Sequence, residues 1–234
     1  MRATSPRPNS LPIPESEVPA AEIPSSVKAV GFWSAVLATF FSLAYDVGQL
    51  AEWFGLLGSQ GGPSSSSTPL GIIVLLTPSL FLGSSFLVLM VSVHQFAAAD
   101  RKIWSQTALA FATMYAVLIS TVYYVQLTFV GPHLTRGAIQ GVEPFVFKPF
   151  DSYFYSVDLL GYTFMSVATL FAARVFTGGG RRRRARWWLT ANGVLIPFLA
   201  LQIYFHPLIW FAAAWAVTFP ASTWTLALIF KEKR

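Results

Sequence analysis

The longest uncharged stretch of the chain constrains its fold more than any other feature. From Trp187 to Phe230 the sequence contains no Asp, Glu, Lys or Arg. At about 1.5 Å per residue, a single helix of this length would extend to roughly twice the hydrocarbon thickness of a bilayer. The stretch must therefore fold back on itself, and "FHPL" at Phe205–Leu208 is the natural hairpin. Two membrane-spanning segments are predicted here.

The composition of the whole chain points the same way. Only 11% of its 234 residues are charged and 54% are hydrophobic, whereas a soluble domain carries about 25% charged residues. So few charges would hardly cover a water-facing surface, which argues against a soluble globular fold. The chain has no cysteine, which excludes disulfides, thiolate nucleophiles and cysteine-ligated metal centres.

Four more apolar segments precede the uncharged stretch. They are separated by "GSQGGPSSSSTP", by "DRK" and by a longer connection that follows Gly131-Pro132. The predicted fold is an all-α integral membrane protein, a six-transmembrane-helix bundle. Its predicted spans are residues 29–57, 70–98, 103–130, 152–176, 187–205 and 207–230.

The two ends of the chain are predicted to lie outside this domain. Residues 1–27 are rich in Pro, Ser and Glu and lack apolar periodicity, which predicts a disordered cytoplasmic tail. Residues 231–234 form a basic cytoplasmic C-terminus. The "SLA" at Ser42–Ala44 resembles the end of a signal peptide, but the long, proline-rich segment before it favours an uncleaved first span.

The motif "TGGGRRRRARWW" orients the predicted bundle. If six helices alternate across a bilayer, fourteen Lys and Arg residues fall on the side of this motif and two, Arg136 and Lys148, on the other. Positive charge stays cytoplasmic, so both termini are predicted inside. The arginine-rich inner loop and the proline-rich tail suit a bacterial inner membrane. The arginine-rich inner loop is expected to set topology and to contact anionic lipid headgroups through Arg181, Arg182, Arg183, Arg184 and Arg186.

Polar side chains gather at one predicted depth, in the outer leaflet. Ionisable groups within spans are costly, so they need a reason. The chain places Asp46 and Asp158 there on different spans, with Tyr155 and Tyr162 on the helical face of Asp158. An outward-facing acidic and aromatic pocket is therefore predicted. Its candidate ligand-binding residues are Asp46, Gln49, Tyr123, Gln126, Tyr155, Asp158 and Tyr162.

Such a pocket predicts a protein that binds or transports a small cationic or amphipathic ligand, held by Coulomb attraction and cation–π contact. Glu52 lies near a helix end, where interfacial water is the simplest explanation for an acid. The alternative function is a non-catalytic subunit or assembly factor whose polar residues bond neighbouring helices; an intramembrane enzyme ranks third. No recognisable catalytic motif, metal-ligand pattern or nucleic-acid reader occurs. No cofactor is expected, and the expected partners are the lipid bilayer and a small-molecule ligand.

Overall fold

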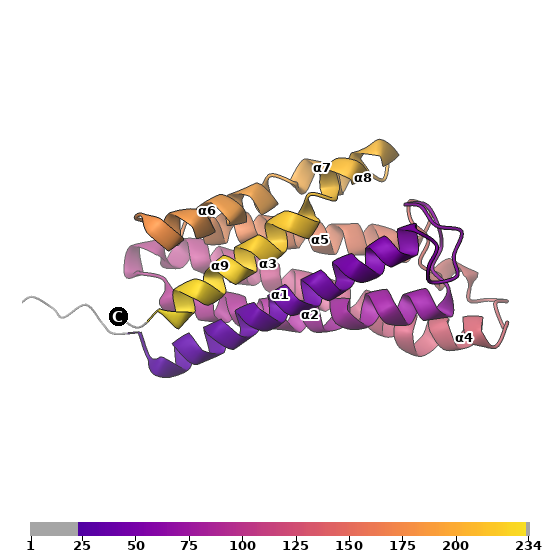
Figure 1. Ribbon diagram of the computed structural model, residues 1–234, viewed down its shortest axis with the longest axis horizontal. Coiled ribbons are helices and arrows are strands. Elements are labelled where there is room, and N and C mark those ends of the chain that lie inside the picture. Colours follow the sequence, from indigo (N-terminus) through magenta and orange to yellow (C-terminus); the bar gives the residue numbers. More distant parts are fainter. Residues whose placement is uncertain (1–22, 233–234) are drawn as a thin grey trace, which may run out of the picture.

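The computed structural model describes residues 23–232, and within them every regular element is a helix (Figure 1). Five helical segments in this range are long and apolar enough to cross a membrane, the pattern of an integral membrane protein. Two of them continue into shorter helical pieces. The segments are α1 (Ser25–Trp53), α2 (Pro69–Phe96), α3 (Lys102–Val125) with η1 (Ala99–Arg101), η2 (Gln126–Val130) and α4 (Gly131–Thr135), α5 (Tyr153–Ala173), and α9 (Trp215–Lys231) with η4 (His206–Leu208) and α8 (Ile209–Ala212).

Local sequence signals fix where two of these helices begin. At the start of α2, the Thr68 hydroxyl accepts a hydrogen bond from the Gly71 amide at 3.1 Å, and Pro69 occupies the first turn. At the start of α5, the Ser152 hydroxyl accepts from the Tyr155 amide at 3.1 Å. Both are side-chain caps that satisfy an otherwise free helix-terminal donor.

The helices close into a ring around a common core. In order around the ring, α1 packs against α2, α2 against α3, α3 against α5, α5 against α6 (Gly180–Gly193), and α6 against α9, which returns to α1. The first three long helices, α1, α2 and α3, alternate in direction, as Figure 1 shows. The chain therefore passes repeatedly between two ends of one bundle.

The predicted fifth span, 187–205, has a different form in the structure. The chain builds α6 and a six-residue α7 (Ile196–Leu201), separated by a turn at Val194–Leu195. Pro197 explains the break, because it cannot donate to the carbonyl of Gly193 and its ring crowds that group. The pair runs along the bundle in Figure 1, but it is not one continuous apolar helix.

The prediction of an arginine-rich loop is wrong. Arg181, Arg182, Arg183, Arg184 and Arg186 lie within the first two turns of α6. Arginine is a good helix former, and the turn is made instead by the preceding glycines. Gly178 and Gly180 have φ of 93° and 59°, the left-handed region that glycine adopts without strain.

The other predicted boundaries are close to those of the structure. α1 begins at Ser25, so the last residues of the predicted tail are helical, and α1 ends at Trp53 rather than at residue 57. The third segment extends to Thr135, five residues beyond its predicted end. Residues 1–22 of the tail and 233–234 of the basic C-terminus lie outside the described residues.

The outward faces of the helices are apolar. On α1, for example, Trp33 and Phe40 are each 61% exposed and Val47 is 68% exposed. A soluble surface rarely exposes large apolar side chains in such a continuous row. This exterior matches a lipid environment.

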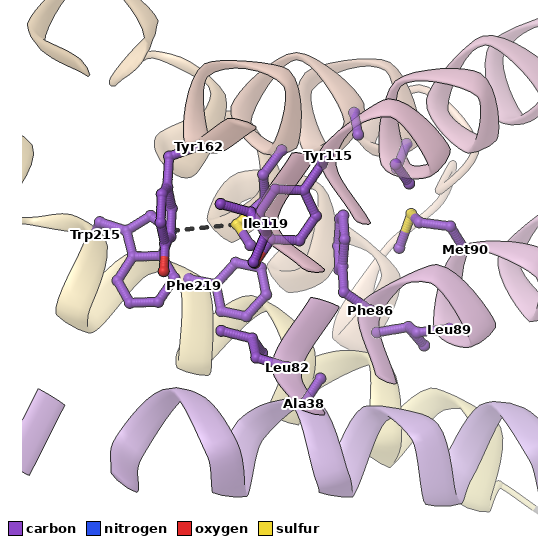
Figure 2. Close-up of a cluster of buried hydrophobic side chains, with 14 of the residues drawn as sticks. Ala38, Leu82, Phe86, Leu89, Met90, Tyr115, Ile119, Tyr162, Trp215 and Phe219 are labelled. Atoms are coloured by element: carbon purple, nitrogen blue, oxygen red, sulfur yellow. Dashed lines mark hydrogen bonds between the residues drawn. The ribbon is translucent and has the colours of Figure 1, made fainter. Parts of the chain in front are cut away.

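The core of the bundle is aromatic (Figure 2). Trp215 and Phe219 of α9 stack at 5.0 Å between ring centroids, and Phe86 of α2 meets Phe219 at 5.4 Å and Tyr115 at 5.8 Å. The Trp215 indole N–H donates to the sulfur of Met165, the contact drawn as a dashed line. This layer fills the middle of the bundle.

Hydrogen bonds between polar side chains also join the helices. The hydroxyls of Thr39 and Thr223 lie 2.8 Å apart and connect α1 to α9. The Asn192 amide of α6 donates to Thr169 of α5 at 3.1 Å, and its carbonyl accepts from Thr218 of α9 at 3.0 Å. Such side-chain bonds between helices fix helix register inside a membrane, where water offers no partner.

Candidate functional site

Polar side chains from three helices meet at the end of the bundle opposite to the arginines. α1 contributes Tyr45, Gln49 and Glu52, α3 contributes Tyr123, and α5 contributes Asp158. These residues reach one level because α1 and α3 end here whereas α5 begins here. The three on α1 share a helical face through their spacing of four and three residues.

The best-defined contact of the site joins α3 to α5. The Tyr123 hydroxyl donates to Asp158 Oδ1 at 2.7 Å, and the same hydroxyl lies 3.2 Å from that of Tyr162. All three side chains are at most 7% exposed. A hydrogen bond from a tyrosine to a buried carboxylate is a strong, geometry-fixing contact, so Asp158 is held in place.

A small enclosed cavity lies beside this contact. Its volume is about 40 Å³, which is room for a water-sized group. Residues of four helices (α1, α2, α3 and α5) and of two connecting loops line the cavity. The lining residues are Tyr45, Gln49, Glu52, Trp53, Gly62, Pro63, Ser65, Ser67, Ile72, Leu75, Leu76, Tyr123, Phe147, Pro149 and Asp158.

Glu52 is the unusual member of this lining. It is only 2% exposed, and neither of its carboxylate oxygens has a hydrogen-bond partner among the described residues. The fold makes room for it: a Cβ at Gly71, in the first turn of α2, would come within 2.8 Å of Glu52 Oε2. The positive end of the α2 dipole thus faces the acid.

The predicted site residues are only partly brought together. Gln49, Tyr123 and Asp158 line the cavity, and Gln49 accepts a hydrogen bond from Tyr45 at 2.9 Å. Tyr162 stands behind Tyr123 and packs edge-on against Trp215. The remaining three predicted residues point elsewhere, as described next.

Asp46 does not line the cavity. It is partly exposed, and its Oδ2 is buried without a hydrogen-bond partner among the described residues. Asp46 precedes Gln49 by three residues and lies off the face that carries Tyr45, Gln49 and Glu52. The acid that joins Asp158 at the cavity is therefore Glu52.

Gln126 and Tyr155 have partners of their own. The Gln126 amide donates to the carbonyl of Phe145 at 2.6 Å, and its carbonyl accepts from the Phe147 amide at 3.2 Å. The Tyr155 hydroxyl donates to Gln202 at 3.3 Å. Gln126 thereby fastens the connection after α4 to the bundle, and Tyr155 fastens α5 to the turn after α7.

The connection between α4 and α5 lies against the cavity, and its Phe147 and Pro149 belong to the lining. Val142 and Val146 are buried in the core. The ring of Phe147 packs edge-on against that of Tyr155, with 5.5 Å between the ring centroids. From the other side, the glycine- and serine-rich loop between α1 and α2 adds Gly62 and Ser65 to the lining. Two loops thus separate the cavity from the end of the bundle.

Two residues that line the cavity, Tyr45 and Glu52, were not among the predicted ligand-binding residues. For Glu52, near a helix end, the sequence predicted contact with interfacial water, and the structure buries it instead. The signal that identifies them is the shared face of Tyr45, Gln49 and Glu52 on one helix. Their burial depends on loops whose path the sequence does not reveal.

The site offers carboxylate, hydroxyl and amide oxygens. Within residues 23–232 no group of three or more His, Asp or Glu side chains is arranged to hold a metal ion. The site therefore lacks the ligand set of a multi-carboxylate or histidine metal centre. Comparisons of the chain with known protein families, with curated proteins and with solved structures gave no match.

Proposed function

We propose that this membrane protein binds, and in its transport cycle moves, a small monovalent cation or a proton at the Glu52–Asp158 cavity. The proposal rests on the burial of Glu52. Its carboxylate is almost fully buried and accepts no hydrogen bond from any donor among the described residues. An ionised carboxylate inside a membrane is costly unless a positive partner compensates it. A proton or a cation is that partner.

The small volume of the cavity favours a smaller ligand than the organic or amphipathic cation that the sequence predicted. Sites for drug-sized molecules measure about 300–1,000 Å³, whereas this cavity measures about 40 Å³. An organic or amphipathic cation would require both covering loops to move. Carboxylate, hydroxyl and amide oxygens are hard ligands that suit a small inorganic cation.

An ion could reach the cavity from the end of the bundle where the α1–α2 loop lies, as in a carrier that opens toward that end. The loop between α1 and α2 contains Gly61 and Gly62, with φ of 76° and 81°, and it borders the cavity. On the other side, the aromatic layer of Phe86, Tyr115 and Phe219 is fully buried. Passage through the bundle therefore requires this layer to rearrange.

The proposal includes a topology. We propose that α6 and α7 together make a sixth crossing, because the chain must return between α5 and α9. The arginine end then faces the cytoplasm with both termini, in accordance with the split of fourteen basic residues against two. The cavity then lies on the outer side, and the basic inner end and the proline-rich tail favour a bacterial inner membrane.

A second candidate function is a structural subunit or assembly factor. It is favoured by Gln126 and Tyr155, whose polar groups are satisfied within the chain. In that case Asp158 serves only to bond Tyr123. The two candidates differ in whether Glu52 responds to cations.

The test is the thermal stability of the purified full-length protein in detergent. Chloride salts of Li⁺, Na⁺ and K⁺ are compared with choline chloride at equal ionic strength, over a range of pH. A ligand that binds only the folded state raises the melting temperature in proportion to its concentration. We expect one small cation, or protonation, to stabilise the wild type, and this response to be lost in Glu52→Gln and reduced in Asp158→Asn.

Asp151→Asn is the matched control, since Asp151 is an exposed acid seven residues before Asp158. Its response should equal that of the wild type. If wild type and Glu52→Gln respond identically to every cation and to pH, the cation proposal fails and the structural role is favoured. Sodium or proton flux into proteoliposomes then separates transport from binding alone.

A further inference from the structure

The outward face of α6 combines arginine with tryptophan. Arg183 and Arg184 are exposed, Trp187 is 68% exposed, and Trp187 and Trp188 each follow one of these arginines by four residues. Residues four apart on a helix lie above one another. We call Arg183, Arg184, Arg186, Trp187 and Trp188 the arginine–tryptophan face.

The packing of α6 fixes the direction of this face. Ala185 and Leu189, on the other side of the helix, are fully buried, and α6 packs against α5 and α9. The Asn192 bonds to Thr169 and Thr218 hold α6 in register with both neighbours. The arginines consequently cannot turn inward without dismantling these contacts.

Positive charge is in large excess around this face. The helix ends that meet here carry ten basic residues within the described range and two acidic ones, Asp100 and Glu232. In residues 23–232 the ion pairs are Arg101–Asp100 and Arg181–Glu232, so the three arginines of the face have no carboxylate partner there. The basic residues are Lys28, Arg101, Lys102, Arg174, Arg181, Arg182, Arg183, Arg184, Arg186 and Lys231.

Tryptophans on the other helices mark the depth of this end. Trp33 of α1 is 61% exposed, Trp224 of α9 is 50% exposed and Trp104 of α3 is 37% exposed. Each lies within two turns of a basic residue at the same end of its helix. Exposed tryptophans at this position form the interfacial belt of membrane proteins, which puts the arginines at headgroup level.

We infer that the arginine–tryptophan face is a binding site for the phosphates of anionic phospholipids in the adjoining leaflet. Arginine engages phosphate oxygens with two parallel N–H donors, which fits a lipid phosphodiester at this depth. The tryptophan rings beside the arginines suit the glycerol and upper acyl region of the same lipid. Nucleic acid fits less well, because a face at headgroup level is shielded by the bilayer.

The test measures lipid binding to the purified full-length protein in neutral detergent. Phosphatidylglycerol and phosphatidylcholine are titrated separately, and retained lipids are counted by native mass spectrometry. We expect preference for phosphatidylglycerol, and a loss of about fivefold in its affinity for each arginine neutralised in Arg183→Gln/Arg184→Gln/Arg186→Gln. Affinity for phosphatidylcholine should not change.

Two further variants make the result specific. Arg183→Lys/Arg184→Lys/Arg186→Lys keeps the charge but removes the two parallel N–H donors, so the preference should fall less than in the triple glutamine variant but below that of the wild type. Arg136→Gln/Lys148→Gln removes two positive charges at the opposite end and should leave the preference unchanged. Equal binding of both lipids by the wild type, or an unchanged preference in the triple glutamine variant, would overturn the inference. So would inorganic phosphate or a short RNA that binds as tightly as phosphatidylglycerol.

Discussion

Glu52 shows how much one buried carboxylate shapes this molecule. A glycine opposite the acid leaves room for it, a helix N-terminus faces it, and the other side chains around it are held by bonds to one another. An unpaired carboxylate in such a place destabilises the empty protein. Residues that weaken a fold in this way are typical of functional sites.

The first prediction at the residue scale follows from that cost. In cation-free buffer, Glu52→Met should raise the free energy of unfolding by about 1–3 kcal/mol, since it removes a buried polar group that has no hydrogen-bond partner among residues 23–232. Asp158→Ala should lower it, because Tyr123 loses its acceptor. Reversible unfolding in mixed micelles measures both. Destabilisation of similar size in the two variants would show that Glu52 has an internal partner.

A second residue-scale prediction concerns Asn192, which joins α5, α6 and α9. Asn192→Leu removes two hydrogen bonds between helices, each worth about 0.6 kcal/mol in membrane proteins. The free energy of unfolding should fall by about 1 kcal/mol in the same micelle assay. Gln106→Leu, an exposed amide on α3, is the control and should change it little. An unchanged free energy of unfolding in Asn192→Leu would mean that packing alone holds α6 in place.

At the scale of elements, Gln126 connects a helix to a loop. It begins the π-helical turn η2, a local widening that often marks functional positions. Its amide bonds both the carbonyl of Phe145 and the N–H of Phe147. This pairing holds the α4–α5 connection over the cavity.

Gln126→Leu should therefore release that connection while α3 stays intact. We expect faster amide hydrogen exchange across residues 143–149, by about tenfold for each 1.4 kcal/mol of protection lost, with no change in α5. Exchange followed by mass spectrometry measures this by segment. Gln140→Leu, an exposed position on the same connection, should leave exchange unaltered. Unchanged exchange in Gln126→Leu would show that apolar packing alone secures the loop.

The elements also show what the sequence could and could not reveal. The long apolar runs and the glycine, serine and proline breaks predicted α1, α2, α3 and α5 within a few residues. The sequence predicted one span over residues 187–205, whereas the structure has the break between α6 and α7 before Pro197. A proline inside a membrane helix either ends the helix or leaves it continuous, depending on neighbouring contacts: α9 continues through Pro220.

The site was predicted only in part for a similar reason. Periodicity placed Tyr123, Asp158 and Gln49 at one level, and the structure brings them to one cavity. It does not reveal how a helix rotates about its axis, which turns Asp46 away and Glu52 inward. Periodicity also does not show that the side-chain amide of Gln126 forms its hydrogen bonds with the backbone of the α4–α5 connection. These features depend on contacts between segments far apart in sequence.

At the scale of the whole molecule, the separation of charge between the ends of the bundle is the dominant feature. The chain has no cysteine, so single cysteines report topology without background. Ser66 and Thr177 are exposed, on the α1–α2 loop and the α5–α6 turn. In intact cells, an impermeant maleimide should label Ser66→Cys and not Thr177→Cys; permeabilisation should expose the latter. Labelling at Thr177→Cys alone would reverse the proposed orientation.

The central claim is that a small cation is bound between Glu52 and Asp158. Thallous ion, a heavy analogue of K⁺ with strong anomalous scattering, tests it most directly in crystals grown with and without the ion. The account predicts one anomalous peak inside the cavity, in contact with carboxylate oxygens of both residues, and its loss in Glu52→Gln. A peak elsewhere, or crystals that give no peak at saturating thallium while Glu52 stays buried, would contradict the binding of a cation, and a melting temperature that is equally independent of pH would contradict the proton as well.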